Sequence, residues 1–339
     1  MQGPRYHPTE FNVEALNDED VYGALSSIAR ASWRQYPAYG KVAAQVAGAE
    51  SRYVRVHDGA DLVAIANLRI RRLPLFRAGV AMIAQGPAII DNYEHRRAEV
   101  IEAIRSQVAV PEGLSLRVNH PLMTKYGTQT KSYKIVPNSN YETFLLDIQA
   151  TESELRSGLD GKWRTDLRRG ERSDVVVTRS QTSKDFRAFQ PLLAEVALSK
   201  GFAPPQDADF FADVADKAGS GENLTIHLAW CDGRLVGGHI GAFSGDIAVY
   251  LLGAVNAEGR NLRASFILQW DVVKYAQERG LKYYDLGGAD RASNPDVFRF
   301  KKRMGGEHYV GPSTIEASAG WSQAIMVSTA EWIYKKVTR

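Results

Sequence analysis

Hydrophobic and polar residues alternate along residues 52–59, which end in Asp58-Gly59, and the alternation resumes along residues 62–68. The same pattern returns at residues 225–233, which end in Asp232-Gly233, and at residues 235–240. A period of two is typical of a half-buried strand, and an Asp-Gly pair between two such runs favours a tight turn. The pattern therefore predicts two β-hairpins, far apart in the chain.

Each predicted hairpin is followed by the same series of elements. The two copies contain an apolar run (80–83 and 247–252), a segment of helical periodicity (96–108 and 264–278) and a further strand (114–118 and 282–286). A helix that joins two neighbouring strands of one sheet makes those strands parallel. The repeated order resembles the layout of a GNAT-type acyltransferase. It predicts an α+β fold of two tandem GNAT-like domains, each a mixed, mostly antiparallel sheet flanked by helices.

We expect the first domain to comprise residues 1–147 and 312–339, and the second to comprise residues 148–311. The C-terminal segment combines Trp321, Trp332 and several aliphatic residues with Lys335 and Lys336. We interpret this segment as a helix that closes the first domain. The alternative is an amphipathic helix that docks on an anionic membrane.

Composition and charge are those of an ordinary globular protein. The chain has 339 residues, a formal net charge of +3 and 24% charged residues. That small excess does not indicate DNA binding, so we expect no DNA partner and place any anion site in a local cluster. A single cysteine, Cys231, excludes an intramolecular disulfide. The sequence shows no signal peptide and no run of apolar residues long enough to span a membrane, so we expect a cytoplasmic location, with the inner face of the membrane as an alternative.

The most distinctive stretch lies near the C-terminal end. A predicted strand ends in Tyr284-Asp285-Leu286-Gly287-Gly288, and after Asn294-Pro295 cations and aromatic rings alternate along residues 298–303. Lys and Arg side chains bind phosphates, and a neighbouring ring can stack on a base or sugar. The stretch predicts the floor of a site for a large phosphorylated substrate, with Lys302 and Arg303 among the donor-binding residues.

Two further groups of cations are candidates for binding. Arg260 and Arg263 precede the second predicted crossover helix, where an acyl-coenzyme A enzyme usually has a glycine-rich phosphate loop, but this segment has only Gly259. The two arginines either hold donor phosphates or are solvated loop charges, and the missing glycines weaken the coenzyme A interpretation. In the basic segment 156–172, Arg164 and Arg168 share a helical face. These two arginines either bind a phosphate-bearing substrate or form i,i+4 ion pairs along a solvated helix.

Four patches of the chain resemble the FemAB-type aminoacyltransferases, which include the FemX-like enzymes. The patches are Gln35 with Tyr39 and Lys41; Gln85-Gly86-Pro87; Lys162-Trp163-Arg164 to Arg169; and residues 284–288 with Asn294-Pro295, Phe300-Lys301-Lys302 and Gly305-Gly306. The chain departs from the family in having Gln85 where an arginine is usual. It also lacks the long helical arm that many members insert in the second domain.

The resemblance implies a function and several residue roles. Members of the family transfer an amino acid from aminoacyl-tRNA to an amine of a peptidoglycan precursor. The first domain then binds the acceptor and the second binds the donor. Lys41 matches a residue that contacts the acceptor's diphosphate, Phe300 one that engages the tRNA acceptor end, and Lys301 one that stabilises the transition state. A fixed cation beside a developing oxyanion lowers the barrier of acyl transfer.

Other candidates keep two interpretations. Asp285 is a catalytic candidate that could orient the acceptor amine or act as a base. Its alternative role is structural, as a carboxylate that caps the following loop. Tyr250 either binds acceptor or donates a proton, or it is a core tyrosine. Lys200, before a loop of the kind that lines substrate clefts, is a further acceptor-binding candidate together with Arg164. The histidines have no ligand-like spacing, so no metal site is predicted.

Two functions remain as alternatives to aminoacyl transfer to a UDP- or lipid-linked muropeptide or glycan. The first is N-acyl transfer from acyl-coenzyme A in exopolysaccharide or envelope biosynthesis, with coenzyme A as the carrier of the acyl group. For aminoacyl transfer from tRNA no cofactor is expected. The second is a GNAT-like module that binds tRNA or a glycan without catalysis.

Overall fold

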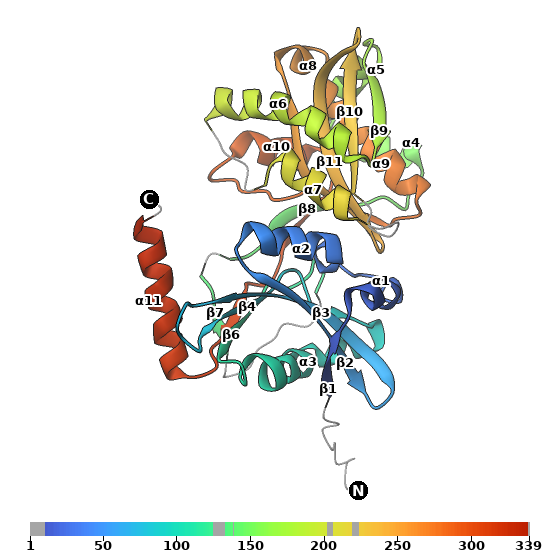
Figure 1. Ribbon diagram of the computed structural model, residues 1–339. Coiled ribbons are helices and arrows are strands. Elements are labelled where there is room, and N and C mark those ends of the chain that lie inside the picture. The colour runs from blue at the N-terminus through green and yellow to red at the C-terminus, as the bar shows by residue number, and fades with distance from the viewer. Residues whose placement is uncertain (1–10, 125–132, 138, 202–205, 219–223, 338–339) are drawn as a thin grey trace, which may run out of the picture. The chain divides into compact units, whose positions relative to one another are not determined.

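The computed structural model describes residues 11–124, 133–137, 139–201, 206–218 and 224–337. The chain forms two compact units, of which unit 1 comprises residues 1–140 and 311–339 and unit 2 comprises residues 141–310. Each unit is built on its own mixed β-sheet with helices against it (Figure 1). The α+β fold with two tandem GNAT-like domains is confirmed.

The sheet of unit 1 has the strand order β1-β2-β3-β4-β6-β15-β7, with β5 paired to β3. Its strands are β1 (Asn12–Leu16), β2 (Glu50–Asp58), β3 (Asp61–Arg72), β4 (Gly79–Ile83), β5 (Ala88–Ile89), β6 (Leu114–Val118), β7 (Lys134–Ile135) and β15 (Ile315–Ala317). The β2–β3 pair is the first predicted hairpin, and β4 and β6 are parallel, as the crossover requires.

Helices cover both faces of the sheet in unit 1. They are α1 (Asp18–Ser26), η1 (Trp33–Gln35), α2 (Pro37–Val46), η2 (Asp91–Arg96), α3 (Arg97–Ile104), the π-helical turn η3 (Arg105–Ala109) and α11 (Trp321–Val337). Alternation along the strands divides the core. Val54 and Ala64 pack with α3, while their neighbours Tyr53 and Ile65 pack with α1 on the opposite face. Helix α11, the segment expected to close this domain, packs against β4 and β6.

The sheet of unit 2 has the strand order β14-β8-β13-β12-β11-β10-β9. Its strands are β8 (Glu142–Asp147), β9 (Val176–Ser180), β10 (Leu224–Cys231), β11 (Arg234–Ser244), β12 (Ile247–Val255), β13 (Tyr283–Asp285) and β14 (Glu307–Val310). The β10–β11 hairpin and the parallel β12–β13 pair repeat the plan of unit 1.

The position of β8 corrects the predicted boundary at residue 147, which assigned this strand to the first domain. β8 pairs with β13 and β14 in the sheet of unit 2, so the boundary falls at residue 140. Alternation identifies a strand, but the choice of sheet is made by partners more than a hundred residues further along the chain.

The helices of unit 2 are α4 (Glu152–Gly158), α5 (Gly161–Glu171), α6 (Ser183–Lys200), α7 (Ala208–Lys217), α8 (Ala257–Asn261), α9 (Ala264–Glu278) and α10 (Pro295–Arg303). The single basic helix predicted after β8 is in fact two helices. Thr151 begins α4 with a capping box, and the Asp160 side chain accepts hydrogen bonds at the start of α5. Each cap satisfies amide groups that would otherwise lack partners, and so fixes a separate helix start.

None of the described helices is long and apolar enough to cross a membrane.

Gly259 provides a test of the packing in unit 2. A β-carbon at this position of α8 would lie 2.3 Å from the carbonyl oxygen of Val236 in β11, so backbone would have to move. We expect Gly259→Ala to lower the free energy of unfolding by about 1–3 kcal/mol, measured by urea denaturation. Gly158→Ala is the control, because a β-carbon there meets nothing within 4 Å. Equal midpoints for the two variants would contradict the packing described.

Candidate functional site

The cationic stretch near the C-terminus forms helix α10. Pro295 occupies the first turn, and the Asn294 side chain caps the helix by accepting a hydrogen bond from the amide of Val297 at 3.2 Å. Helical spacing then separates the cations. Arg299 and Lys302 are exposed, whereas Lys301 is directed inward and is only 5% exposed.

Lys301 is held by a backbone carbonyl and an aromatic ring. Its ammonium donates a hydrogen bond to the carbonyl oxygen of Gly288 at 2.7 Å, and it lies 4.9 Å from the ring centroid of Tyr250. The ring face is electron-rich and attracts a cation. An ammonium has three N–H bonds, and no other acceptor for them lies among the described residues. Two donors are therefore available to a bound group.

Burial controls the charge of this lysine. Removal from water lowers the pKa of Lys301 to about 8, while the neighbouring carboxylate of Asp285 acts in the opposite direction. Most Lys301 side chains are therefore protonated at neutral pH, and the cation is removed a little above it.

The turn that supplies the Gly288 carbonyl is fixed by Asp285. One oxygen of Asp285 accepts hydrogen bonds from the Thr143 hydroxyl at 2.5 Å and the Gly287 amide at 2.9 Å, and the other accepts from the Tyr141 hydroxyl at 2.8 Å. Burial raises the pKa of Asp285, and these donors oppose the rise. Such contacts favour the structural interpretation, a carboxylate that caps the loop, over the role of a base.

Gly287 lets the turn approach β12. Its φ is +75°, and a β-carbon there would lie 2.8 Å from the carbonyl oxygen of Tyr250. Tyr250 then lies under Lys301 on one side and against His239 on the other, with ring centroids 4.8 Å apart. Burial raises the pKa of Tyr250 to about 12, so its phenol keeps its proton. The ring of Tyr250 supports the lysine.

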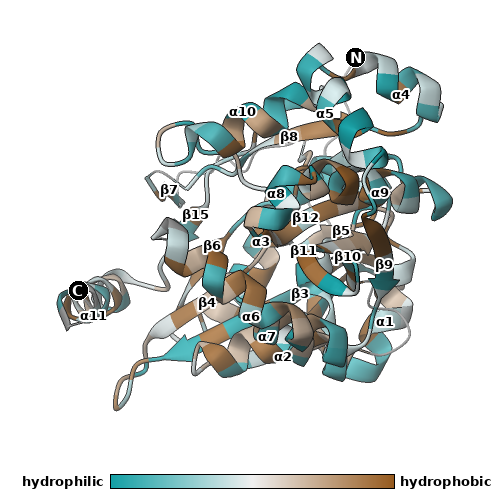
Figure 2. Ribbon diagram, turned by 90° about the horizontal axis from the view of Figure 1, so that it is seen from above, coloured by the Kyte–Doolittle hydropathy of each residue, from teal (hydrophilic) through white to brown (hydrophobic). Residues whose placement is uncertain are grey.

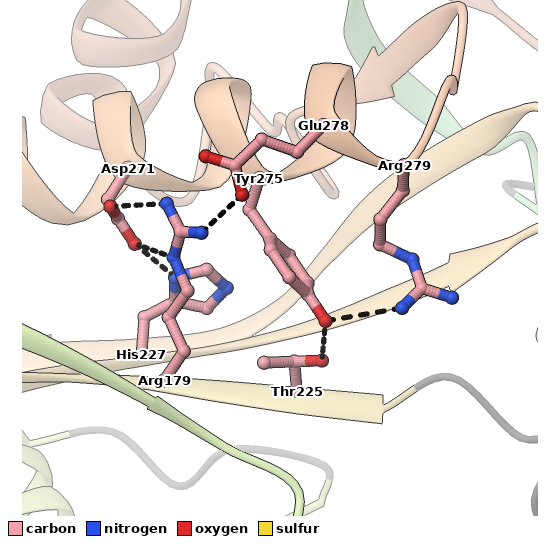
Figure 3. Close-up of polar contacts among 7 residues, drawn as sticks. All are labelled: Arg179, Thr225, His227, Asp271, Tyr275, Glu278 and Arg279. Carbon is pink, nitrogen blue, oxygen red and sulfur yellow. Dashed lines mark hydrogen bonds and ion pairs between the residues drawn. The ribbon is translucent and has the colours of Figure 1, made fainter.

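Two buried histidines continue the polar interior of unit 2. His239 Nε2 lies 3.0 Å from the Tyr284 hydroxyl, which donates to the amide oxygen of Gln269 at 2.6 Å. His227 Nδ1 lies 2.7 Å from Asp271 (Figure 3). Burial lowers the pKa of both histidines, so both are neutral.

Asp271 links α9 to the sheet. Burial opposes its ionisation, but hydrogen bonds from Arg179 and His227 hold the pKa of Asp271 below its usual range. Because the carboxylate accepts, His227 donates through Nδ1–H. In Figure 3 these three side chains lie side by side between α9 and strands β9 and β10. No group of three or more potential ligands suited to a metal ion is found in the part of the chain that the structure describes.

The predicted donor-binding residues are not all beside Lys301. Phe300 packs against Trp163 and Phe266, with centroids 5.9 and 5.1 Å away, and is a partly buried residue at the edge of the core. Lys302 is exposed, and Arg303 lies 4.0 Å from Asp160. In this structure Phe300 therefore serves packing, while Lys302 and Arg303 lie at the surface of α10.

The arginines before α9 have structural partners. Arg263 is paired with Asp166 of α5 at 3.0 Å, and Arg260 donates to the carbonyl oxygen of Val255 at 3.3 Å. Gly259 lies within α8, packed on β11, where an acyl-coenzyme A enzyme would have an open phosphate loop. In residues 259–263, Gly259 therefore serves packing, and the two arginines are engaged with other protein groups.

The predicted acceptor-binding residues are dispersed. Arg164 donates to the carbonyl oxygens of Arg156 and Ser157 at the end of α4, a capping role. Lys41 lies on α2 of unit 1, half-exposed and paired with Asp18 at 2.7 Å. Lys200 is the last residue of α6, and its side chain lies outside the described residues, as does the loop 202–205.

The four patches of family resemblance form two neighbourhoods in the structure. In unit 1 the Gln35 amide donates to the carbonyl oxygen of Ala84, and a β-carbon on Gly86 would meet that amide at 2.6 Å. In unit 2 Trp163 packs on Phe300. These contacts bring residues of the first two patches together in unit 1 and residues of the last two together in unit 2. Sequence reasoning missed the supporting contacts of Lys301, because no local pattern shows that a glycine carbonyl and a strand tyrosine will meet a lysine.

Comparison with known proteins adds sequence relatives. A family model described as an acetyltransferase (GNAT) domain matches residues 160–302, within unit 2. Lipid II:glycine glycyltransferase of Staphylococcus saprophyticus is 33% identical over 91 residues, 25% of this chain and 21% of that protein. The enzyme of that name from Staphylococcus haemolyticus is 35% identical over 65 residues, 19% of this chain and 15% of that protein. The chain thus spans about a fifth or less of these relatives' length.

Solved structures show the same fold at low identity. The crystal structure of FemX has a TM-score of 0.77 and 15% identity, and the match covers 91% of this chain and 97% of that one. A tandem GNAT protein from the clavulanic acid biosynthesis pathway has a TM-score of 0.52 and 14% identity, with 92% and 99% covered. The fold is that of tandem GNAT proteins, and the match to the acetyltransferase (GNAT) domain model lies within unit 2. The matches to the lipid II:glycine glycyltransferases cover part of the chain and agree with the resemblance of the four patches to the FemAB-type enzymes.

The structural role of Asp285 can be tested by its removal. Asp285→Ala leaves the buried Thr143 hydroxyl and Gly287 amide with fewer acceptors, so we expect the free energy of unfolding to fall by about 1–3 kcal/mol, measured by urea denaturation. Asp296→Ala, which removes an exposed carboxylate on α10, is the matched control. An Asp285→Ala protein as stable as the control would show that the turn does not depend on this carboxylate.

Proposed function

We propose that the protein is an N-aminoacyltransferase that moves an aminoacyl group from aminoacyl-tRNA to an amine of a peptidoglycan precursor or related cell-envelope polymer. The observation that carries the proposal is the buried Lys301 ammonium, which has two N–H donors without an acceptor among the residues that the structure describes. The resemblance to the FemAB-type enzymes and the partial match to lipid II:glycine glycyltransferases support the choice of substrates.

Lys301 would act on the tetrahedral intermediate. The acceptor amine attacks the ester carbon of the donor, and the carbonyl oxygen becomes an oxyanion that accepts hydrogen bonds from the two available N–H groups. Burial strengthens this interaction, because water does not compete for the charge. Gly288 and Tyr250 already fix the ammonium, so little reorganisation opposes the reaction.

The same step has to move a proton. The C–N bond forms, the ester C–O bond breaks, and the proton lost by the amine passes to the departing ribose oxygen. This route requires no protein base, which agrees with the oxygens of Asp285 being occupied by three donors. Lys301 supplies charge and position, and the substrates supply the proton path.

The surroundings of α10 favour tRNA as the donor. Arg299 and Lys302 are exposed on this helix, and a half-exposed Arg303 lies beside them, so the helix presents cations to a phosphate backbone. Lys41 in unit 1, whose ion pair with Asp18 lies at the surface, is the proposed contact for the acceptor's phosphates.

The second candidate is N-acyl transfer from acyl-coenzyme A, favoured by the match to the acetyltransferase domain model. It would use the same cation against the same kind of oxyanion. The segment where a coenzyme A phosphate loop would lie argues against this candidate. Gly259 is packed on β11, and Arg260 and Arg263 are bonded to other protein groups.

A donor screen tests the proposed function. Radiolabelled aminoacyl-tRNA pools and radiolabelled acyl-coenzymes A are offered separately, each with UDP-linked and lipid-linked muropeptide. We expect label to reach the muropeptide amine from tRNA alone. Transfer from coenzyme A alone would establish the second candidate. Binding of tRNA without transfer from any donor would indicate a non-catalytic module and overturn the proposal.

The role of Lys301 predicts that substitutions at two neighbouring lysines of α10 change different kinetic constants. We expect Lys301→Ala to lower kcat by about 10²- to 10³-fold, as for the loss of an oxyanion donor. Its exposed neighbour is the comparison, and Lys302→Ala should raise KM for the donor while kcat changes little. Circular dichroism and thermal unfolding check that both variants fold. Full activity of Lys301→Ala would remove the lysine from the mechanism.

The lowered pKa of Lys301 predicts the alkaline limit of activity. The cation is present below the pKa and is lost as pH rises through it, so kcat should fall with a midpoint near pH 8. The residual activity of Lys301→Arg should not fall between pH 7 and 9 in this way, because a guanidinium keeps its proton. A kcat that rises through pH 8 would mean that the neutral amine is the active form.

A further inference from the structure

Unit 1 exposes apolar side chains at the turn that joins β3 to β4. Leu75 is 101% exposed and Phe76 60% exposed, although most large apolar side chains of this unit are buried. The turn follows directly on Arg71 and Arg72 and ends with Arg77, and all three arginines are exposed. An apolar tip with cations at its base therefore projects from the sheet.

Helix α11 adds a second exposed apolar group. Trp321, Ile325 and Trp332 follow one another at spacings of four and seven, which places them on one face of the helix, and all three are exposed. Ile333 and Tyr334 are also about half exposed, and the Lys336 ammonium lies 4.0 Å from the Trp332 ring centroid. A helix that only closed the domain would bury this face.

The two groups form one surface, here called the β3–β4/α11 surface. The Arg71 guanidinium lies 5.3 Å from the ring centroid of Tyr334, which joins the end of β3 to α11. Helix α11 also packs against β4. In Figure 2 hydrophilic colour along the end of β3 gives way to hydrophobic colour at the turn.

The charge of this surface is positive. Its cations are Arg71, Arg77 and Lys336, whereas the charge of Arg72 is offset by its ion pair with Glu112. The nearby carboxylates are engaged, since Glu112 pairs with Arg52 and Arg72, and Glu331 pairs with Arg117. A positive rim around apolar side chains is complementary to a layer of negative head groups over hydrocarbon.

We propose that the β3–β4/α11 surface docks this protein on an anionic lipid membrane. Leu75 and Phe76 enter the acyl region, while Trp332 and Tyr334 lie at the head-group level, where aromatic rings with a polar edge are favoured. Arg71, Arg77 and Lys336 contact lipid phosphates. Exposed aliphatic Leu75 favours a bilayer over RNA, because stacking on bases uses aromatic rings and gives an aliphatic tip no role.

The inference deepens the proposed function and rests on it in one respect only. If the protein transfers aminoacyl groups to muropeptides, this surface would favour an acceptor anchored in the membrane over one linked to a soluble nucleotide. Membrane docking itself does not require that activity, so the two can fail separately.

Flotation with lipid vesicles tests the surface. The chain of 339 residues is mixed with vesicles of phosphatidylcholine alone or of phosphatidylcholine with phosphatidylglycerol, at low and high salt. We expect binding to the anionic vesicles, weakened by salt, and at least tenfold weaker binding for the double variant Leu75→Ser, Phe76→Ser. Arg71→Gln with Arg77→Gln should reduce binding to anionic vesicles in the same way. Val46→Ser, which removes an exposed apolar residue of α2, is the control and should bind as the wild type does.

Several results would overturn the proposal. The first is absence of vesicle binding by the wild type, and the second is equal binding by the Leu75→Ser, Phe76→Ser variant. Loss of tRNA binding in that variant with vesicle binding unchanged would assign the surface to RNA. A wild-type dimer that the variant lacks, seen by light scattering, would assign it to a second copy of the chain. Transfer to a UDP-linked acceptor, assayed without vesicles, should be the same in wild type and variant, and this keeps the two proposals apart.

Discussion

The candidate site depends on one constraint, the burial of an ammonium group whose hydrogen-bond acceptor, among the described residues, is one backbone carbonyl. Lys301 can be held inside unit 2 because the Gly288 carbonyl and the Tyr250 ring meet it there. Both are placed by the same turn. Asp285 ties that turn to β8, and Gly287 lets it come within contact of β12. The order of strands in unit 2 is therefore a condition for the chemistry of the lysine.

The rest of the interior supports this arrangement. The ring of Tyr250 packs against His239, His239 contacts the Tyr284 hydroxyl, and Tyr284 donates a hydrogen bond to Gln269. The buried histidines and tyrosines are neutral, because burial of a charge would cost free energy. Asp271 keeps its charge because hydrogen-bond partners stabilise the carboxylate. The parallel β12–β13 pair, a result of the β-α-β crossover, brings Tyr250 and Asp285 to one end of the sheet.

Much of the fold follows from the sequence, and less of the site does. The repeated hairpin, strand, helix and strand predicted both sheets, because alternation and turn residues are local signals. The pairing of β8 is a long-range choice and was assigned to the wrong domain. Lys301 was identified by family resemblance. Its burial and the packing of Phe300 against the core depend on contacts between distant segments, which one sequence does not show. The capping role of Arg164 depends on the end of α4 just before α5 begins.

The titration of the Lys301 side chain tests this account most directly. The protein is labelled with carbon-13 at lysine Cε, and the Lys301 resonance is assigned by its absence from Lys301→Arg. Its chemical shift is then followed against pH. A buried ammonium beside Gly288 and Tyr250 should titrate with a midpoint near pH 8, whereas exposed lysines titrate near 10.4. A Lys301 resonance that titrates with the exposed lysines would contradict the site on which the proposed function depends.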